Sequence, residues 1–204
     1  MRRDSQPGTG RDRGQAHVLE GIAAALLVLT SVIFALQVTA VTPLTASTAN
    51  QHLQTQGAGT ASGLLAAADE RGTLRETVLY WNETGTQFHD SGEAATYADT
   101  VPTAFGSTLE AAFRDRGIVY NVNLLYLTAD RTQRERQLVH QGDPSDHAVS
   151  VTRTVVLYDD DRLRYANETA SNRTVSEAPS YFAGDISEGP LYNVVRVEVI
   201  VWRV

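Results

Sequence analysis

The hydrophobic pattern begins with one long apolar run near the amino terminus. Residues 21–41 read GIAAALLVLTSVIFALQVTAV and contain no charged side chain. A helix needs about 20 such residues to cross the hydrocarbon core of a bilayer. A soluble domain rarely buries a helix of this length on every side. The pattern therefore predicts a transmembrane helix over residues 18–41.

The chain stays compatible with a helix beyond this run. Residues 46–70 are rich in Ala, Thr, Gln and Leu, and Gly72 provides a stop signal. We expect a helical stalk over residues 42–72. Three of its leucines are expected to contact the following domain: Leu53, Leu64 and Leu65.

Two shorter helices are predicted next. Thr73-x-x-Glu76 has the form of a capping box, and the apolar positions after it extend to Trp81. A second helix is expected to begin at Thr103 and to stop at Gly117. Its apolar residues recur at helical spacing: Phe105, Leu109, Ala112 and Phe113.

After these helices the hydrophobic period becomes that of β-strands. Residues 118–127, 148–158 and 191–204 are dense in Val, Leu and Tyr. The last segment alternates clearly, with four valines on one face: Val195, Val197, Val199 and Val201. Three aspartates at 159–161 predict a turn into a short returning strand. Helices followed by strands predict an α+β fold, in which the stalk helix packs on an antiparallel sheet in a domain spanning residues 73–204.

The distribution of charge predicts a topology. Residues 1–17 contain four arginines, whereas none occurs between Val41 and Arg71. The positive-inside rule therefore places residues 1–17 in the cytoplasm and the domain outside the cell. Three Asn-x-Thr acceptor sites for glycosylation lie on the side predicted to be outside, at Asn82, Asn167 and Asn172.

The composition narrows the function classes. The chain has no cysteine, which excludes disulfides, thiol catalysis and Cys-ligated metals. Its 17 basic residues are all arginine, and they are outnumbered by 24 acidic residues. The acidity belongs to residues 42–204, which carry 21 acids and 13 arginines. Such a domain repels phosphate backbones, which argues against nucleic-acid binding, and it suits concentrated salt.

Two processing events compete with a simple anchor. Val38-Thr39-Ala40 is an acceptable cleavage site for a signal peptidase, although the apolar run exceeds the usual 7–15 residues of a signal peptide. The second event is a cut within the short basic leader at Arg13-Gly14-Gln15, with Glu20 at the start of the apolar run. Such a cut would leave the apolar helix in the mature protein.

The run RGQAHVLEGIAAALLVLTSVIFALQVTAVTPLTAS resembles archaeal type IV pilin-like proteins, and most of all an uncharacterised family of single-span pilin-like proteins from haloarchaea. The resemblance implies that Glu20 pairs with the new amino terminus of a neighbouring subunit during assembly. A carboxylate at the edge of hydrocarbon is costly unless paired, which agrees with this role. After a cut following Gly14, Glu20 would be the sixth residue, whereas pilins usually carry it fifth. The alternative is an interfacial Glu20 in an uncut anchor.

Few residues suggest chemistry. His140, Asp143, Asp146 and His147 lie in the sequence HQGDPSDH and offer metal ligands, but Gly142 and Pro144 favour an ordinary polar loop. No hydrolase, zinc-protease or phosphate-loop motif occurs. Four aromatic residues suggest either a binding face or a core: Tyr80, Trp81, Phe88 and Tyr97. We therefore predict no cofactor, no metal and no enzymatic activity.

The sequence thus favours a single-pass, membrane-anchored, pilin-like surface protein with a structural or assembly role. Its predicted partners are the lipid bilayer and other pilin-like subunits, without nucleic acid. The alternative is a monomeric anchored module that binds or senses a ligand outside the cell. An anchored enzyme is a third class, for which the sequence offers no catalytic constellation.

Overall fold

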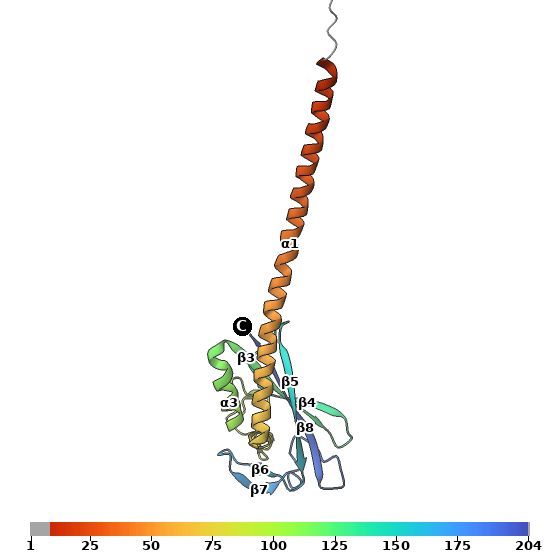
Figure 1. The fold of residues 1–204 in the computed structure, drawn as a ribbon. Coiled ribbons are helices and arrows are strands. Elements are labelled where there is room, and N and C mark those ends of the chain that lie inside the picture. The colour runs from red at the N-terminus through yellow and green to blue at the C-terminus, as the bar shows by residue number, and fades with distance from the viewer. Residues whose placement is uncertain (1–8, 204) are drawn as a thin grey trace, which may run out of the picture. The chain divides into compact units, whose positions relative to one another are not determined.

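The computed structural model describes the backbone of residues 9–203 and the side chains of residues 17–36, 55–92 and 94–203. Contacts between residues divide the chain into two units, Met1–Gln51 and His52–Val204. Helix α1 (Thr9–Glu70) contributes residues to both units (Figure 1). The carboxyl-terminal unit therefore includes the last part of α1 as well as all of the strands.

In the first unit, the apolar segment His17–Leu36 is exposed around its whole circumference. Its mean hydropathy is 2.3, and none of it is buried. Eleven of the thirteen large apolar side chains that are exposed among the described residues belong to this segment. Such a surface is unfavourable in water, and the segment has the length and composition of a single membrane anchor or of a signal sequence.

The hydroxyl groups within this apolar segment are satisfied by the helix itself. Thr30 Oγ1 donates to the carbonyl oxygen of Leu26 at 2.9 Å, and Ser31 Oγ donates to that of Leu27 at 2.7 Å. Because these donors bond to the preceding turn, they need neither water nor another helix. The two hydroxyls are therefore compatible with an apolar environment.

The second unit has an α+β fold, as the sequence predicts. After α1 the elements are α2 (Thr73–Val78), β1 (Trp81–Asn82), β2 (Gln87–Phe88), η1 (Glu93–Ala95), α3 (Ala104–Phe113), η2 (Arg114–Arg116), β3 (Ile118–Leu127), β4 (Gln133–His140), β5 (Val149–Tyr158), β6 (Arg162–Arg164), β7 (Ala170–Thr174) and β8 (Leu191–Arg203). A four-stranded sheet in the order β4-β3-β8-β5 forms its centre, and every pair in it is antiparallel. Two small two-stranded sheets, β1-β2 and β6-β7, accompany it.

The three strands predicted from the sequence are confirmed as β3, β5 and β8, each within one residue of the expected bounds. β8 lies between β3 and β5, and its register pairs Val199 with both Val122 and Val151. The four alternating valines of β8 are at most 2% exposed, whereas Arg196 on the opposite face is exposed. The period-two pattern therefore identified the buried face correctly.

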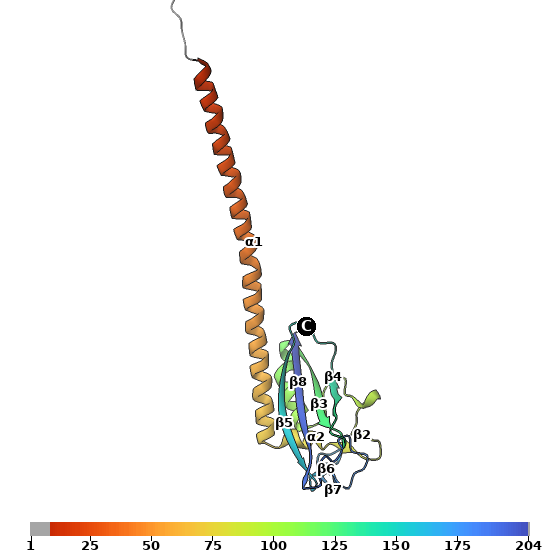
Figure 2. The same ribbon diagram turned by 90° about the vertical axis from the view of Figure 1, so that its right-hand side faces the viewer.

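Helices α1 and α3 cover that buried face (Figure 2). In α1 the buried residues Ala61, Leu65 and Ala68 follow helical spacing, and they join one core with the strands. Leu64 is half-buried against the same core, while the side chain of Leu53 lies outside the described residues. α3 contributes Phe105, Leu109 and Phe113, all fully buried.

The second short helix begins and ends where the sequence predicts. The side chain of Thr103 caps α3 by accepting a hydrogen bond from the amide of Gly106 at 3.4 Å. The Thr103 hydroxyl also lies 2.7 Å from that of Thr77 in α2, which links the two helices. The helical turn after α3 ends at Gly117, whose φ of +62° favours glycine.

The capping box predicted at residues 73–76 is wrong. The amino-terminal cap of α2 is Gly72, and the hydroxyl of Thr73 donates back to the carbonyl oxygen of Ala68 at 3.2 Å. Glu76 instead pairs with Arg164 at 2.8 Å. Because only two residues separate the end of α1 from Thr73, the Thr73 hydroxyl satisfies a carbonyl in the last turn of α1 rather than the amides of α2. Trp81, which the pattern extended into this helix, lies in β1.

Two further features differ from the sequence pattern. Strand β4 was not expected, because its residues are mostly polar and only Leu138 and Val139 are buried. The turn at residues 159–161 is present, and Asp161 accepts a hydrogen bond from the amide of Tyr158 at 2.8 Å. The strand after it, β6, pairs with β7 instead of folding back on β5.

Candidate functional site

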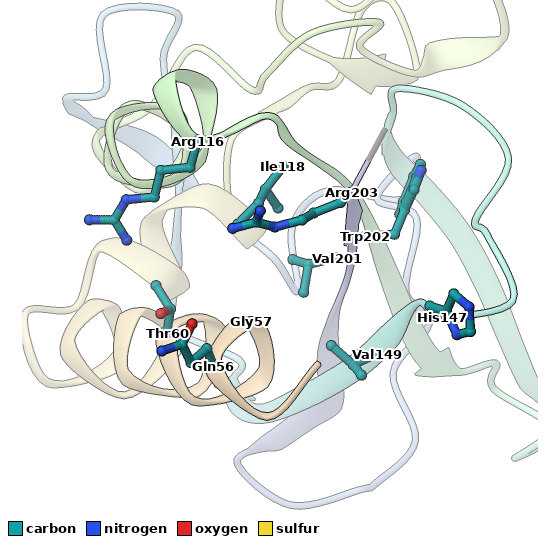
Figure 3. Close-up of a pocket in the computed structure, with 10 residues that line it drawn as sticks. All are labelled: Gln56, Gly57, Thr60, Arg116, Ile118, His147, Val149, Val201, Trp202 and Arg203. Atoms are coloured by element: carbon teal, nitrogen blue, oxygen red, sulfur yellow. The ribbon is translucent and has the colours of Figure 1, made fainter. Parts of the chain in front are cut away.

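A groove of about 350 Å³ lies between the first turns of α1 within the second unit and one end of the central sheet (Figure 3). We call it the Arg116–Arg203 groove. Its lining comes from α1, η2, β3, β5, β8 and the loop before β5: Gln56, Gly57, Thr60, Arg116, Ile118, His147, Val149, Val201, Trp202 and Arg203. Because these residues are distant in the sequence, only the fold brings them together.

The floor of the groove is apolar and closely packed. A Cβ atom added at Gly57 would lie 3.6 Å from a methyl group of Val201 and 3.9 Å from one of Val149. An alanine side chain at this position would therefore make ordinary van der Waals contact with the ends of β8 and β5. Ile118 of β3 is half-buried and packs against the same core. The floor thus offers aliphatic surface to a ligand.

The edge of the groove is polar and positively charged. The side chains of Arg116 and Arg203 extend over the same opening, with Gln56 and Thr60 of α1 on the facing side (Figure 3). Both arginines are exposed, and neither side chain forms an ion pair or hydrogen bond with another described residue. No carboxylate is among the residues that line the groove. The arrangement can bind an anion.

A second cleft of about 340 Å³ lies beside the end of α3. The hydroxyls of Tyr120 and Thr100 are buried there, and neither makes a hydrogen bond with a described residue. Burial raises the pKa of Tyr120, so its hydroxyl stays protonated at neutral pH. Gln141 closes part of the cleft by accepting from the amide of Tyr120 at 3.0 Å and donating to the carbonyl oxygen of Asp99.

The residues predicted to act in processing and assembly lie in α1. For Arg13, Gly14 and Gln15 the structure describes the backbone alone, so the predicted cut stays a prediction. Glu20 is described and exposed, and one of its carboxylate oxygens lies 3.7 Å from Nδ1 of His17, one helical turn earlier. Sequence reasoning overlooked His17, although its i, i+3 spacing to Glu20 was visible.

The three predicted glycosylation sites differ in accessibility. Asn167 and Asn172 are exposed, whereas Asn82 is half-buried in β1. Asn82 Oδ1 accepts hydrogen bonds from the amides of Thr84 and Gly85, which forms a tight turn. In the second site, Asn167 Oδ1 accepts from the hydroxyl of Thr169 at 2.7 Å. Asn167 and Asn172 are therefore the more accessible acceptors.

The segment HQGDPSDH is a connection between two strands. His140 is the last residue of β4, and its Nδ1 lies 3.0 Å from the side-chain nitrogen of Gln137. Asp143, Asp146 and His147 follow in the loop before β5, and His147 reaches the Arg116–Arg203 groove. Among the described residues, no group of three or more His, Asp or Glu side chains could hold a metal ion.

The four aromatic residues around the first acceptor site belong to the core. Tyr80, Trp81, Phe88 and Tyr97 are each at most 6% exposed. The rings of Trp81 and Phe88 meet edge to face, with centroids 5.2 Å apart. Burial and the carboxylate of Asp90 raise the pKa of Tyr80 to about 12. These residues therefore stabilise the domain, and the binding-face interpretation does not apply to them.

These features define a class of protein: an exposed apolar helix that could span a membrane, followed by an α+β domain with an antiparallel sheet. The chain belongs to a family of unknown function, DUF7288, whose model matches residues 13–201. The match includes the apolar segment together with the domain, so the two form one family architecture. A comparison with curated proteins and one with solved structures each found no match.

Proposed function

We propose that this protein is a single-pass, pilin-like membrane protein with a structural or assembly role at the cell surface. The observation that carries the proposal is the apolar segment His17–Leu36, which is exposed on all sides and satisfies its own hydroxyls. A bilayer is the environment that such a surface fits. The family match covers this segment, which supports a part in the mature protein's function.

The proposed orientation follows from the arginines of residues 1–17, which favour a cytoplasmic amino terminus and a domain outside the cell. The resemblance of about residues 13–50 to haloarchaeal pilin-like proteins and the acidic surface support a halophilic surface protein. Asn167 and Asn172 are its proposed glycosylation sites, since both are exposed.

Glu20 is the residue through which assembly would act. In the described helix its nearest cation is His17, at 3.7 Å, and both side chains are more than 80% exposed. A cut at residues 13–15 would create a free amine close to this carboxylate in a neighbouring subunit. An intersubunit ion pair at the edge of hydrocarbon is then favourable, because the unpaired carboxylate is costly there.

The test combines the mature amino terminus with a pair of substitutions. Protein purified from its native membrane should begin at Gln15 or Ala16 by mass spectrometry. Glu20→Gln should reduce chemical crosslinking between pilin-like subunits several-fold, whereas His17→Gln should leave crosslinking unchanged and so serves as the matched control. An intact Arg13–Gly14–Gln15 junction, together with crosslinking that Glu20→Gln does not alter, would contradict the assembly role.

The Arg116–Arg203 groove supports a second candidate, a monomeric anchored module that binds a ligand. This monomeric module would have an uncut leader and no crosslinked species, and its domain would bind a ligand. The same crosslinking experiment therefore separates the two functions.

A further inference from the structure

The Arg116–Arg203 groove combines two surfaces that a single class of ligand would use. Its edge presents two guanidinium groups, and its floor presents Ile118, Val149 and Val201. A ligand that fits both carries an anionic head and an apolar body. The apolar floor is continuous with the core, to which Val201 belongs and against which Ile118 and Val149 pack, whereas the two arginines are exposed.

Arg116 and Arg203 are the two arginines that line the groove, and they belong to the eight arginines of residues 42–204 that form no ion pair among the described residues. Five arginines of the second unit form ion pairs with carboxylates: Arg75, Arg114, Arg153, Arg164 and Arg173. Arg116 and Arg203 have no such partner among the described residues, although acids outnumber arginines by 21 to 13 over residues 42–204. Two uncompensated guanidinium groups at one opening create a local positive potential that attracts anions.

The position of the groove in the chain points to the source of the anion. Gln56, Gly57 and Thr60 are among the first residues of the unit that begins at His52. Only 15 residues, 37–51, separate this unit from the apolar segment that ends at Leu36. Even a fully extended chain of that length spans no more than about 50 Å. If the segment is anchored, this short connection tethers the domain to a bilayer, and lipid headgroups are then the anions at highest local concentration.

We propose that the Arg116–Arg203 groove binds an anionic membrane phospholipid. The two guanidinium groups hold the phosphate through charge-assisted hydrogen bonds, and Gln56 and Thr60 donate to its polar headgroup. The aliphatic floor covers the first carbons of an acyl or alkyl chain. The inference rests on the membrane anchorage proposed above and would fix the domain against the bilayer.

The experiment uses the full-length chain in phosphatidylcholine nanodiscs. They contain either no anionic lipid or about 20% phosphatidylglycerol, which gives roughly the charge density of an anionic membrane. A trace of phosphatidylglycerol with a photoreactive diazirine on its acyl chain is crosslinked, and the labelled peptides are mapped by mass spectrometry. We expect labels on peptides that contain Gly57, Ile118 or Val201. Photoreactive phosphatidylcholine should label these peptides much less.

The double variant Arg116→Gln/Arg203→Gln should reduce this labelling by a factor of roughly ten or more, the usual effect of losing a charge-assisted hydrogen bond. The matched control is Arg71→Gln/Arg134→Gln, which removes the same charge from two exposed arginines outside the groove. Unchanged thermal unfolding of both variants in detergent shows that the fold is intact. Equal loss of labelling in both double variants would overturn the proposal in favour of general charge attraction.

Three other results would also overturn the proposal that the groove binds an anionic phospholipid. Labelling that does not depend on the headgroup would show that the groove has no preference for anionic lipid. Inhibition of labelling by millimolar inorganic phosphate, with equal thermal stabilisation of the protein in neutral nanodiscs, would identify a free anion as the occupant. Extraction of the protein from native membranes by alkaline carbonate would refute the anchorage and the lipid site with it, whereas loss of headgroup preference in an anchored protein refutes the lipid site alone.

Discussion

Gly106 lies where the first turn of α3 meets the backbone of the preceding loop. A Cβ atom at this position would lie 1.9 Å from the carbonyl oxygen of Val101 and 2.7 Å from the hydroxyl of Thr100. The neighbouring atom is backbone, so it cannot rotate away. We expect Gly106→Ala to destabilise the domain by about 2 kcal/mol or more, because the loop or the helix must move. Urea unfolding followed by near-ultraviolet circular dichroism measures the change.

Gly63 provides the matched control. It lies in α1, and a Cβ atom there would have no neighbour within 4 Å. Alanine favours a helix over glycine by about 0.5–1 kcal/mol, so Gly63→Ala should leave the domain as stable or slightly more stable. Equal stability of Gly106→Ala and Gly63→Ala would contradict the close approach seen at Gly106.

Single residues also show how far local sequence rules extend. Thr103 was correctly predicted to begin a helix, because its side chain meets the amide of a residue three positions later. Thr73 has the same local signature, yet its hydroxyl bonds to Ala68. The difference is that α1 ends just before Thr73 and offers an unsatisfied carbonyl. A capping pattern therefore identifies a helix boundary without deciding which of two adjacent helices the side chain serves.

Asn193 links three elements of the domain. It lies in β8 with no exposed surface, and its side-chain nitrogen donates to the carbonyl oxygens of Leu127 and Gly184. Its Oδ1 accepts from the amide of Leu127 at the end of β3. One amide group thus holds β8, the end of β3 and the segment before β8 together.

We expect Asn193→Ala to destabilise the domain by about 2–4 kcal/mol, since it opens a cavity at a fully buried position and leaves backbone groups of the half-buried Leu127 and Gly184 without these partners. The exposed Asn172, substituted in the same way, is the control and should change stability by less than about 0.5 kcal/mol. Hydrogen exchange should show faster exchange at Leu127 in Asn193→Ala alone. Protection at Leu127 equal to that of the unaltered protein would contradict the linking role.

The elements that the sequence predicted share one property. β3, β5 and β8 bury apolar residues at regular spacing, so period-two alternation identifies them. β4 lies at the edge of the sheet and buries only two adjacent residues, so its sequence carries no such period. No local sequence pattern indicates the Arg116–Arg203 groove either, because its residues come from segments up to about 150 positions apart and meet only after folding.

Electrostatics of the complete chain give the last prediction. Acids exceed arginines by eight over residues 42–204, which follows from 21 acids and 13 arginines. This excess disfavours the compact state in dilute buffer. Five ion pairs, each exposed or half-buried, oppose it, and exposed pairs contribute about 0–1 kcal/mol each. Salt weakens both the repulsion and the ion pairs, so its net effect on the stability of the domain depends on which of the two is larger.

We expect repulsion to dominate and the melting temperature of the domain to rise by several degrees between 0.1 M and 2 M salt. The screening length falls from about 10 Å to less than about 3 Å over this range, which removes long-range repulsion more completely than contact pairing.

Substitutions at two neighbouring aspartates distinguish the charge repulsion from the ion pairing. Asp160 is exposed and has no partner among the described residues, whereas Asp161 pairs with Arg75 at 3.0 Å. Asp160→Asn should raise the melting temperature at low salt and flatten its salt dependence, while Asp161→Asn should lower it. A melting temperature that stays constant or falls with salt would show that the ion pairs outweigh the repulsion, and the halophilic interpretation of the acidic surface would then be wrong.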